Sequence, residues 1–474
     1  MKKLLLTFPN QRWHKQDVNT TWNLYPSTLC LLAEMVKDIV EVKIIDAQFY
    51  NLSINDFVQQ VEEYSPDYVG VSVLTSEYGN ILDVVADEVK KINAHIVVIA
   101  GGVYPTIDYE TILDNHNIDY CVRGEGELVL PELLKYLIDD VNNKIPVDGV
   151  VYRELDELIV TPRAFVPDLT KLPWPDYSLV NIEDYLTEEA TDRADWRLES
   201  PSLRLIVTRG CPVGCSFCQV EYISGKKIRT REPVDIVNEL EWFKNKYGIK
   251  SLVFQDDNIS LQKKFFLELL KLMIERDLKL KWIIQAFAIF TLTDEMLDLM
   301  VKAGCVGVNA AIESGNQRVM NDIVLKPLKL KKVTPLIKKL KDAGLFVHAN
   351  FIIGFPGETW DEIRETIHFA EACNADYVRF FVAMPLSHTR MLDMAIEKDV
   401  LDIGEDDIFI DWRFGQITSD EWTAKDISIL RAYEWDRINF GTEEKRKKMA
   451  GFWGVDVADI KRIRKRTRDS LTFL

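Results

Sequence analysis

The sequence predicts an α/β protein in which two parallel-sheet domains are followed by a mainly helical region. Short apolar runs with strand spacing alternate with helix-spaced segments twice, once over residues 1–140 and again over residues 201–385. This alternation is typical of parallel sheets whose strands are connected by helices. Beyond residue 385 the periodicity becomes irregular, and residues 386–474 are expected to form a helical C-terminal capping region.

The composition is that of a globular protein with an acidic surface. The chain has 474 residues, is 47% hydrophobic and carries a net charge of −17. Such a charge disfavours nonspecific binding to nucleic acid. No stretch is long and apolar enough to predict a transmembrane segment, and the apolar run at the start ends at Pro9, so it is expected to be a buried strand. Seven cysteines without a disulfide-like framework predict a cytoplasmic location.

The first domain is predicted to be a doubly wound parallel sheet. Its five strands are expected at Leu4–Phe8, Val42–Ile45, Tyr68–Leu74, Ile96–Ala100 and Tyr120–Val122. Its helices are expected at Ser27–Lys37, Ile54–Glu63, Gly79–Lys91, Thr106–Asp114 and Glu127–Ile138. Ligands of such sheets bind at the carboxyl ends of the strands. Glycines at these ends would let a ligand approach the backbone closely.

Residues 141–200 are predicted to be a linker. Val147–Arg153 and Leu158–Thr161 have the pattern of a small hairpin, and several prolines then exclude a long helix. Trp174 in this segment is expected to be a packing residue.

The second domain, residues 201–385, is predicted to contain six strand–helix units. Its strands are expected at Leu203–Val207, Ser251–Phe254, Trp282–Ala286, Val306–Ala311, Phe346–Ile353 and Tyr377–Ala383. Six such units fit a partial (β/α)6 barrel, whose active site would lie at the carboxyl ends of the strands.

A cluster of three cysteines follows the first strand of the second domain. Cys211, Cys215 and Cys218 lie within eight residues, and Pro212 and Gly214 prevent a helix from running through them. Thiolates at this spacing suit an iron–sulfur cluster with one open iron. A structural zinc site completed by a distant fourth ligand is the alternative. Cys121, Cys305 and Cys373 lie on apolar stretches and are expected to be inert core thiols.

The Cys-x-x-x-Cys-x-x-Cys motif, with Phe217 before its last cysteine, resembles the cluster motif of radical S-adenosylmethionine (radical SAM) enzymes. The resemblance implies that the three cysteines hold a [4Fe–4S] cluster whose open iron binds S-adenosylmethionine (SAM), with Phe217 among the residues that contact SAM. Reductive cleavage of SAM would then give a 5′-deoxyadenosyl radical, so the cofactors would carry the difficult chemistry.

Three further segments resemble the SAM-binding motifs of this family. Gln255-Asp256-Asp257 would bind the amino group of SAM, although the acidic pair could instead cap the helix before Ile259. Glu313-Ser314 resembles the ribose-binding motif, and a carboxylate suits paired hydroxyls.

The third segment, Asn350–Glu358, resembles the motif that packs the adenine of SAM. Ile352 and Gly354 match the family pattern. Asn350 stands where the motif has its first glycine, and Glu358 falls one residue late.

The first domain resembles the cobalamin-binding domain that precedes many radical SAM barrels, and together the resemblance covers residues 1 to about 385. It implies that the strand ends of the first domain contact cobalamin, through Ser72, Leu74, Thr75, Gly101, Gly102, Gly124, Glu125 and Gly126. The cobalt-ligating motif of other cobalamin proteins is missing, because Arg12 and Asp17 flank His14 in place of Asp and Gly. His14 is therefore expected at the surface, which leaves the lower face of the cobalt unassigned.

The resemblance implies a cobalamin-dependent radical SAM enzyme, and the commonest reaction of that family is methylation of an unactivated carbon. A cyclase or ring-rearranging enzyme without methyl transfer is the alternative, and a cobalamin-binding regulator is a third possibility. An external electron donor of the flavodoxin or ferredoxin type is also implied. The sequence assigns neither the substrate nor a catalytic residue beyond the cofactor sites.

The C-terminal region contains four tryptophans and one basic run. Trp412, Trp422, Trp435 and Trp453 are expected mainly to pack, and some could cap the mouth of the barrel. Residues 461–468 are predicted to be a solvated helix face, with a site for an anionic substrate as the alternative.

Overall fold

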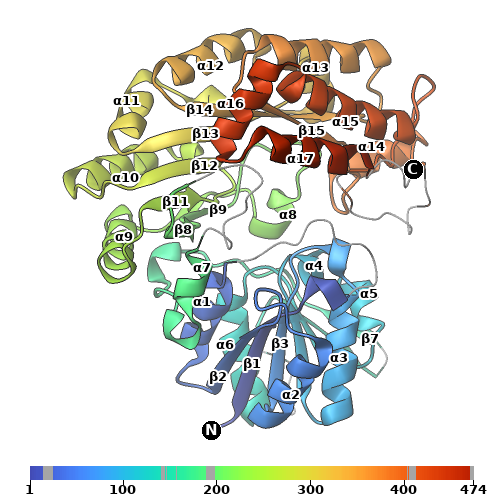
Figure 1. Cartoon of the computed structure of the whole chain (residues 1–474). Helices are drawn as coiled ribbons and strands as arrows, with labels where there is room; N and C mark the ends of the chain where they lie inside the picture. Colours follow the sequence, from blue (N-terminus) through green and yellow to red (C-terminus); the bar gives the residue numbers. More distant parts are fainter. Residues whose placement is uncertain are drawn as a thin grey trace. The chain divides into compact units, whose positions relative to one another are not determined.

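The computed structural model describes residues 1–13, 25–139, 145, 147–155, 157–187, 198–402, 404, 411 and 413–469 (Figure 1). It divides into two compact units. The first comprises Met1–Tyr185 with Tyr222–Ser224, and the second comprises Leu186–Glu221 with Gly225–Leu474. His14, Asp17 and Trp412 lie outside the described residues.

The first unit contains a seven-stranded sheet in the order β2-β1-β3-β4-β5-β6-β7. The strands are β1 (Lys3–Phe8), β2 (Glu41–Asp46), β3 (Tyr68–Ser72), β4 (Val97–Gly101), β5 (Tyr120–Val122), β6 (Val150–Glu154) and β7 (Glu157–Val160). Strands β1 to β5 are parallel, as predicted. The predicted hairpin forms as β6 and β7, and it extends the sheet with two antiparallel strands.

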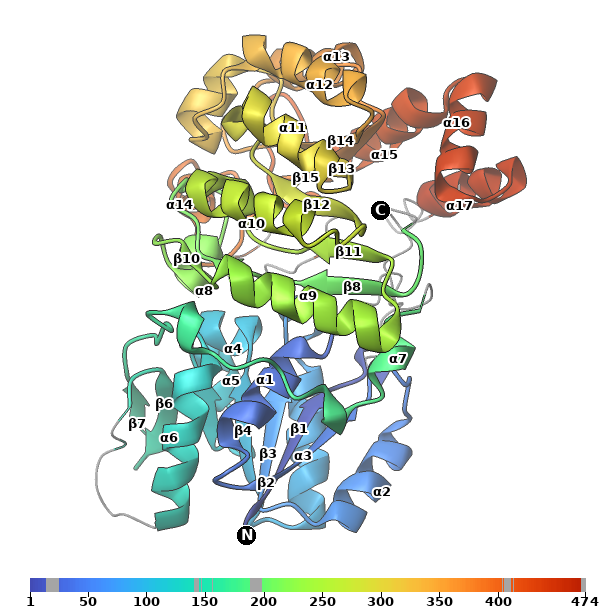
Figure 2. The same cartoon turned by 90° about the vertical axis from the view of Figure 1, so that its left-hand side faces the viewer.

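Helices cover both faces of this sheet (Figure 2). One core packs apolar residues of α1 (Ser27–Val36) and α6 (Gly126–Asp139) against Leu4, Leu6 and Tyr68. The other packs α2 (Ile54–Tyr64), α3 (Ile81–Ile92) and α5 (Tyr109–Leu113) against alternate residues of the same strands. This is the doubly wound arrangement predicted from the sequence. The remaining short helices are η1 (Gln11–Trp13), η2 (Ser76–Tyr78), α4 (Val103–Ile107), η3 (Leu169–Lys171), η4 (Tyr177–Leu179) and α7 (Ile182–Tyr185).

The prediction of a single helix over residues 106–114 is wrong. The chain forms two short helices, α4 and α5, that meet at Asp108, whose backbone is not helical (φ −132°, ψ 53°). Aspartate disfavours a helix interior because its side chain competes for nearby backbone groups.

The second unit contains a six-stranded parallel sheet in the order β15-β14-β13-β12-β11-β8, so β8 and β15 are its edges in the described chain. The strands are β8 (Ser202–Leu205), β11 (Ser251–Phe254), β12 (Lys281–Phe287), β13 (Cys305–Glu313), β14 (Phe346–Ile353) and β15 (Tyr377–Val382). Strands in chain order with helical connections form the predicted partial barrel. Two short antiparallel strands, β9 (Thr208–Arg209) and β10 (Arg229–Thr230), lie apart from this sheet.

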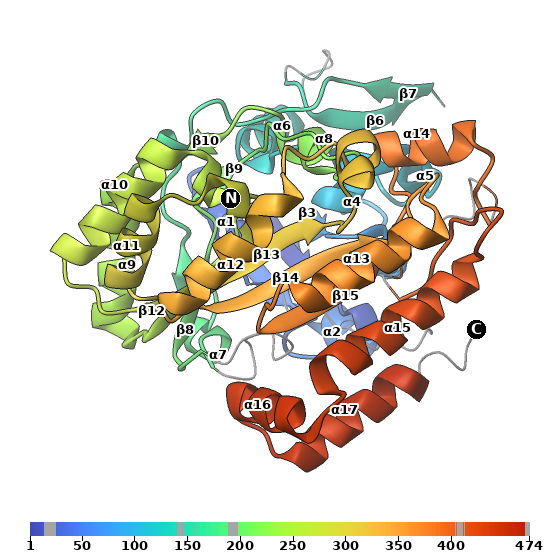
Figure 3. The same ribbon diagram turned by 90° about the horizontal axis from the view of Figure 1, so that it is seen from above.

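The connecting helices pack on one face of the six-stranded sheet (Figure 3). Fully buried Trp282, for example, contacts the rings of Phe254 and Phe266 on that face. The longer helices of these connections are α9 (Pro233–Tyr247), α10 (Lys263–Glu275), α11 (Asp294–Lys302), α12 (Val333–Asp342) and α13 (Trp360–Ala372). The chain between the strands also forms the short elements α8 (Val220–Ser224), η5 (Ile259–Leu261), η6 (Ile289–Thr291), η7 (a π-helix, Val319–Val324) and η8 (Leu330–Lys332).

The C-terminal region is helical, as predicted, with α14 (Arg390–Glu397), α15 (Ala424–Phe440), α16 (Glu443–Trp453) and α17 (Val457–Asp469). Helix α15 runs beside the edge strand β15 (Figure 3). The Asn439 side chain accepts from Val378 N at 2.9 Å and donates to Val378 O at 2.7 Å. Asn439 therefore satisfies backbone groups that a seventh strand would otherwise bind.

The basic run lies on α17. Arg464 pairs with Asp436 at 2.5 Å, whereas the Arg462 and Lys465 side chains are more than two-thirds exposed. These contacts fit the predicted solvated face. Among the described helices, none combines the length and apolar character that crossing a bilayer requires.

Candidate functional site

The cysteine loop lies between β9 and α8, and backbone contacts fix its two ends. Cys211 N donates to Gly225 O at 3.1 Å, and Cys218 N donates to Cys215 O at 3.1 Å. Gly210 has φ 91°, and a Cβ there would lie 2.5 Å from Lys227 O. The loop is therefore closed at its base by a contact that only glycine permits.

The three cysteines of the loop differ from the other four. Cys211, Cys215 and Cys218 are half-buried thiols, whereas Cys30, Cys121, Cys305 and Cys373 are buried in the core. The predicted burial of Cys121, Cys305 and Cys373 in the core is therefore confirmed.

The donor chemistry of this loop fits a cluster. Burial raises the pKa of Cys215 to about 12 and that of Cys218 to about 11. A bound iron would provide the positive charge that keeps such thiols deprotonated. In the described chain, no group of three or more His, Cys, Asp or Glu side chains is arranged around one metal ion. A four-iron cluster does not require this, because each cysteine binds a different iron.

Asp256, which follows β11, holds the segment that leads into the cysteine loop. Its Oδ1 accepts from Val207 N at 2.9 Å, Thr208 N at 2.5 Å and Thr208 Oγ1 at 2.7 Å. Burial raises the pKa of Asp256 to about 7. Asp257 Oδ2 accepts from Gly210 N at 3.3 Å. Both carboxylates therefore bind backbone just before Cys211.

This geometry corrects one interpretation of the acidic pair. The helical turn η5 has Asn258 at its N-cap, and no side chain caps it, so the capping role is wrong. Asp256 is only 2% exposed, and its Oδ1 is used by the chain itself. Gln255 and Asp257 are half-buried and remain the predicted contacts for an amino group.

Glu313 ends β13 in a strained conformation. Its φ is 78°, and the pairing of β13 with β14 shifts register between Ala311 and Glu313. The Glu313 carboxylate pairs with Lys326 Nζ at 2.8 Å, and both side chains are buried. Lys326 Nζ also donates to Ala311 O at 2.6 Å. Positive φ at a non-glycine residue costs energy and is common at functional sites.

Lys326 lies near the cysteine loop as well. Its charge partly offsets the effect of burial on the pKa of Cys215. Val324, two residues before it, accepts a 3.0 Å hydrogen bond from Ser216 N. The segment after the π-helix η7 therefore connects Glu313 to the cysteine loop.

Ser314, predicted to contact a sugar, is fully buried and serves the fold. Its hydroxyl lies 3.1 Å from Thr366 Oγ1 and accepts from Asn316 N at 3.1 Å. Gly315 packs so closely on α13 that a Cβ would lie 2.5 Å from Phe369 Cβ. These contacts fix the turn that presents Glu313.

Glu358, whose role the sequence leaves open, organises the loop after β14. Its Oε2 accepts from Gly354 N at 2.8 Å and Phe355 N at 3.0 Å. Burial raises the pKa of Glu358 to about 8. The indole of Trp422 donates to Glu358 O at 2.9 Å, so one C-terminal tryptophan packs at a strand end as expected.

Phe217 of the cysteine loop lies beside the loop after β14, because its ring centre is 6.2 Å from that of Phe355.

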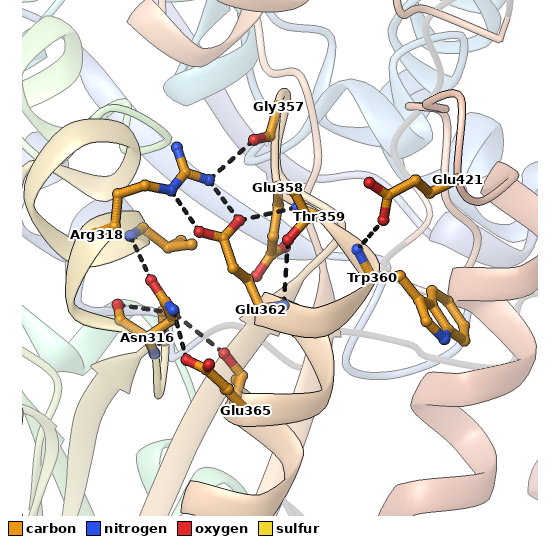
Figure 4. A network of polar contacts seen from close by, with 12 residues as sticks. Asn316, Arg318, Gly357, Glu358, Thr359, Trp360, Glu362, Glu365 and Glu421 are labelled. Carbon is orange, nitrogen blue, oxygen red and sulfur yellow. Dashed lines mark hydrogen bonds and ion pairs between the residues drawn. The ribbon is translucent and has the colours of Figure 1, made fainter.

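A polar network that the sequence analysis missed connects the turns after β13 and β14 (Figure 4). Arg318 pairs with Glu362 and donates to Gly357 O at 3.0 Å. Asn316 donates to Glu365 at 2.6 Å, and Trp360 N donates to Glu421 in the C-terminal region at 2.7 Å. The Thr-x-x-Glu pattern at residues 359–362, a capping box, was the available sequence signal.

The two glycines at the carboxyl end of β4 differ in what surrounds them. A Cβ on Gly101 would meet nothing within 4 Å, whereas one on Gly102 would lie 2.6 Å from Val73 O and 3.2 Å from Ser72 Oγ. Gly102 also has φ 101°. Nearby Leu74 is 38% exposed. An open backbone surface beside an exposed apolar side chain fits a large flat ligand such as a corrin.

The predicted contacts after β5 are occupied by the chain itself. Glu125 Oε2 accepts from Val166 N at 2.6 Å, and Glu125 N donates to Ala164 O at 2.8 Å. A Cβ on Gly124 would lie 2.2 Å from Ala164 O, and Gly126 begins α6. The structure thus accounts for Gly124 and Glu125 by the packing of residues 164–166.

Thr75, a predicted contact after β3, also has a partner in the chain. Its Oγ1 accepts from Glu77 N at 3.2 Å, and Thr75 is the N-cap of η2.

Comparisons with known proteins match this architecture. Residues 205–370 match the Radical SAM superfamily, and residues 20–134 match the B12 binding domain. The uncharacterized methyltransferase PH0819 of Pyrococcus horikoshii is 31% identical over 85% of this chain and 84% of its own length. Cytidylyl-2-hydroxyethylphosphonate methyltransferase of Streptomyces wedmorensis is 28% identical over 91% of this chain and 89% of its own length.

Other similar proteins include a cyclase and a solved methyltransferase. The anaerobic magnesium-protoporphyrin IX monomethyl ester cyclase of Rubrivivax gelatinosus is 28% identical over 81% of this chain and 68% of its own length. The structure of the radical SAM methyltransferase TsrM from Kitasatospora setae, solved with cobalamin and a [4Fe–4S] cluster, aligns with a TM-score of 0.69 at 20% identity. That alignment covers 84% of this chain and 78% of TsrM, and it shows that the two share a fold.

Proposed function

Because the chain belongs to the cobalamin-dependent radical SAM enzymes, we propose that it methylates an unactivated carbon of a substrate that is not yet identified. The observation that supports this most is its similarity, over most of its length, to two proteins named as methyltransferases. The three half-buried thiols of the cysteine loop fit the cluster that such a reaction needs.

The cluster and SAM supply hydrogen abstraction when bound, and cobalamin carries the methyl group. In the proposal, Cys211, Cys215 and Cys218 hold the cluster, and residues 201–385 form the radical SAM domain. Residues 1–140 form the cobalamin-binding domain. An external flavodoxin or ferredoxin would deliver the electron.

We assign the SAM contacts to the strand ends of the second unit. Glu313 accepts hydrogen bonds from the sugar hydroxyls, since its carboxylate is held in place by Lys326. Gln255 and Asp257 receive the amino group, and Ile352 and Gly354 pack the adenine. Ser314 and Glu358 hold the backbone of the turns that carry Glu313 and Gly354, and Asp256 holds the segment that leads into the cysteine loop.

Cobalamin contacts are assigned to the strand ends of the first unit. Ser72 ends β3 and is followed by Leu74 and Thr75, and Gly101 ends β4 and is followed by Gly102. The open space above Gly101 supports this assignment, because a corrin could lie against the bare backbone there.

The first experiment tests the cluster. Anaerobically reconstituted protein should contain one [4Fe–4S] cluster and cleave SAM when reduced, and the triple Cys→Ala variant should do neither. A four-iron cluster in the triple variant would refute the assignment of the cysteines.

The second experiment distinguishes methyl transfer from cyclisation or rearrangement. Cyclisation or rearrangement is the alternative because one of the similar proteins is named as a cyclase. With SAM deuterated in its methyl group, a methyltransferase should put label into the product and form S-adenosylhomocysteine together with 5′-deoxyadenosine. Turnover of the true substrate to 5′-deoxyadenosine alone, with no label in the product, would favour the alternative.

A further inference from the structure

Asn350 and Arg379 are direct partners on the neighbouring strands β14 and β15. Phe351 and Phe380, the next residue along each strand, are buried, and Phe351 contacts Phe369 of α13. Successive side chains of a strand point to opposite faces. Asn350 and Arg379 therefore point together to the sheet face opposite the connecting helix α13, which is the inner face of the partial barrel.

Asn350 is a polar residue on this inner face that the fold does not use. It stands where the adenine-binding motif that the segment resembles has glycine. Its side chain is half-buried and makes no hydrogen bond to another described residue. An amide with two donors and an acceptor in such a position can bind a ligand at little cost.

Arg379 extends its charge toward the carboxyl end of the barrel. Its guanidinium lies 5.7 Å from the ring of Phe381, two residues further along β15. Phe381 is the partner of Ile352 on β14, so the cation lies beside the segment proposed to pack the adenine of SAM. A guanidinium has five N–H donors and can hold an anion together with another partner.

Arg431 adds a second cation from α15, next to the same edge strand. Its Nε is buried and has no hydrogen-bond partner among the described residues. One turn further on, Trp435 donates to Tyr377 OH of β15 at 2.7 Å. Burial lowers the pKa of Arg431 to about 10, with Arg413 acting in the same direction and Asp411 opposing it. Desolvating a cation without an ion-pair partner is unfavourable, and a bound anion would offset that cost.

Among the described residues, the acidic group whose charge acts on Arg431 is Asp411, and it already has a partner. Asp411 is bound by Arg413 at 2.8 and 2.5 Å, and Glu313 is paired with Lys326. In a chain with a net charge of −17, the described residues at this edge include two arginines and the unbonded amide of Asn350.

We propose that Asn350, Arg379 and Arg431 form the substrate subsite for an anionic group with two or more oxygens, a carboxylate or a phosphoryl-type group. The proposal rests on the proposed function, because it places the substrate of that reaction on the inner face of the barrel. The planar N–H fork of arginine fits such anions with two parallel hydrogen bonds.

Binding of simple anions to the cluster- and cobalamin-loaded protein tests this without SAM or turnover. Calorimetric titration with methylphosphonate and with acetate should give saturable binding of at least one anion, and the tighter of the two identifies the oxyanion class. Arg379→Met and Arg431→Met should each weaken that binding about tenfold or more. Arg364→Met, on the exposed surface of α13, is the matched control and should bind the anion like the wild type.

Circular dichroism and cluster absorbance show that each variant is folded and loaded, and Arg379→Gln and Arg431→Gln replace any methionine variant that fails this check. No saturable binding of either anion, or equal binding by the wild type and both arginine variants, would overturn the proposal. Failure of the proposed function is seen separately, as absence of SAM cleavage by the reduced wild type.

Discussion

Lys326 and Glu313 form a buried ion pair, with 2.8 Å between Nζ and Oε1, at the point where β13 leaves regular strand geometry. The lysine is thirteen residues further along the chain and returns to this point after the π-helix. The pair fixes the carboxylate that we assign to the sugar of SAM.

Replacing Lys326 by methionine should destabilise the second unit. Glu313 would be left as a buried carboxylate without its counter-ion, which typically costs about 3–5 kcal/mol. The urea midpoint of this unit should fall, and the double variant Lys326→Met/Glu313→Gln should recover part of the loss. Lys331→Met, at an exposed position, should change stability by less than about 0.5 kcal/mol. A midpoint for Lys326→Met equal to that of the wild type would show that the ion pair does not contribute.

Asp256 should control how much cluster the protein holds. In Asp256→Leu, two backbone N–H groups and the Thr208 hydroxyl lose their acceptor, so the segment before Cys211 should lose its position. Iron and sulfide content after reconstitution should fall to less than about half of the wild-type value. Asp256→Asn keeps an acceptor oxygen and should retain most of the cluster. Full cluster content in Asp256→Leu would contradict this positioning role.

Glu358 should make stability depend on pH. Burial raises the pKa of Glu358 in the folded state to about 8 from its ordinary value of 4.5. The stabilisation that protonated Glu358 gives the folded state is therefore fully present below pH 4.5 and is lost as the pH rises toward and through about 8. The reason is that the carboxyl ionises more easily in the unfolded chain. Urea midpoints between pH 5 and 8.5 should consequently fall more steeply for the wild type than for Glu358→Gln. Exposed Glu275→Gln is the control, and parallel pH profiles for wild type and Glu358→Gln would refute the prediction.

Gly101 and Gly102 should respond differently to alanine. Gly102→Ala is strained by its positive φ and by contact with Val73 O, so it should lower the melting temperature of the protein without cobalamin. Gly101→Ala should leave that temperature unchanged, because its Cβ meets nothing within 4 Å. If the corrin lies against this backbone, Gly101→Ala should still weaken cobalamin binding, as measured by absorbance titration. Unchanged cobalamin affinity in Gly101→Ala would remove Gly101 from the binding surface.

Apolar periodicity was sufficient to predict the strands of both sheets, because their buried runs are short and bounded by polar residues. Strand β14, for example, has the predicted bounds of Phe346–Ile353. Periodicity could not predict that β6 and β7 would extend the first sheet, since the spacing of apolar residues within a strand does not indicate which distant strand it pairs with.

The candidate site was predicted less completely, for a physical reason. A carboxylate after a strand can bind a ligand or the backbone of a neighbouring loop, and the sequence does not show the path of that loop. Buried Asp256 and Glu125 bind backbone, and Asp257 also binds backbone, at Gly210 N, but is only half-buried. Lys326 was missed because its position beside Glu313 depends on the π-helix between them, and no simple apolar spacing indicates that turn.

The contact between Asn439 and Val378 has a consequence for how the chain can be shortened. An open parallel sheet exposes unpaired amides and carbonyls at each edge, and such edges recruit strands from other molecules. Because α15 covers β15 and Asn439 occupies both backbone groups of Val378, the C-terminal region takes up edge groups that could otherwise pair with a strand of another molecule. A version ending near residue 385 would retain all six strands of the second sheet and yet be prone to aggregate through that edge.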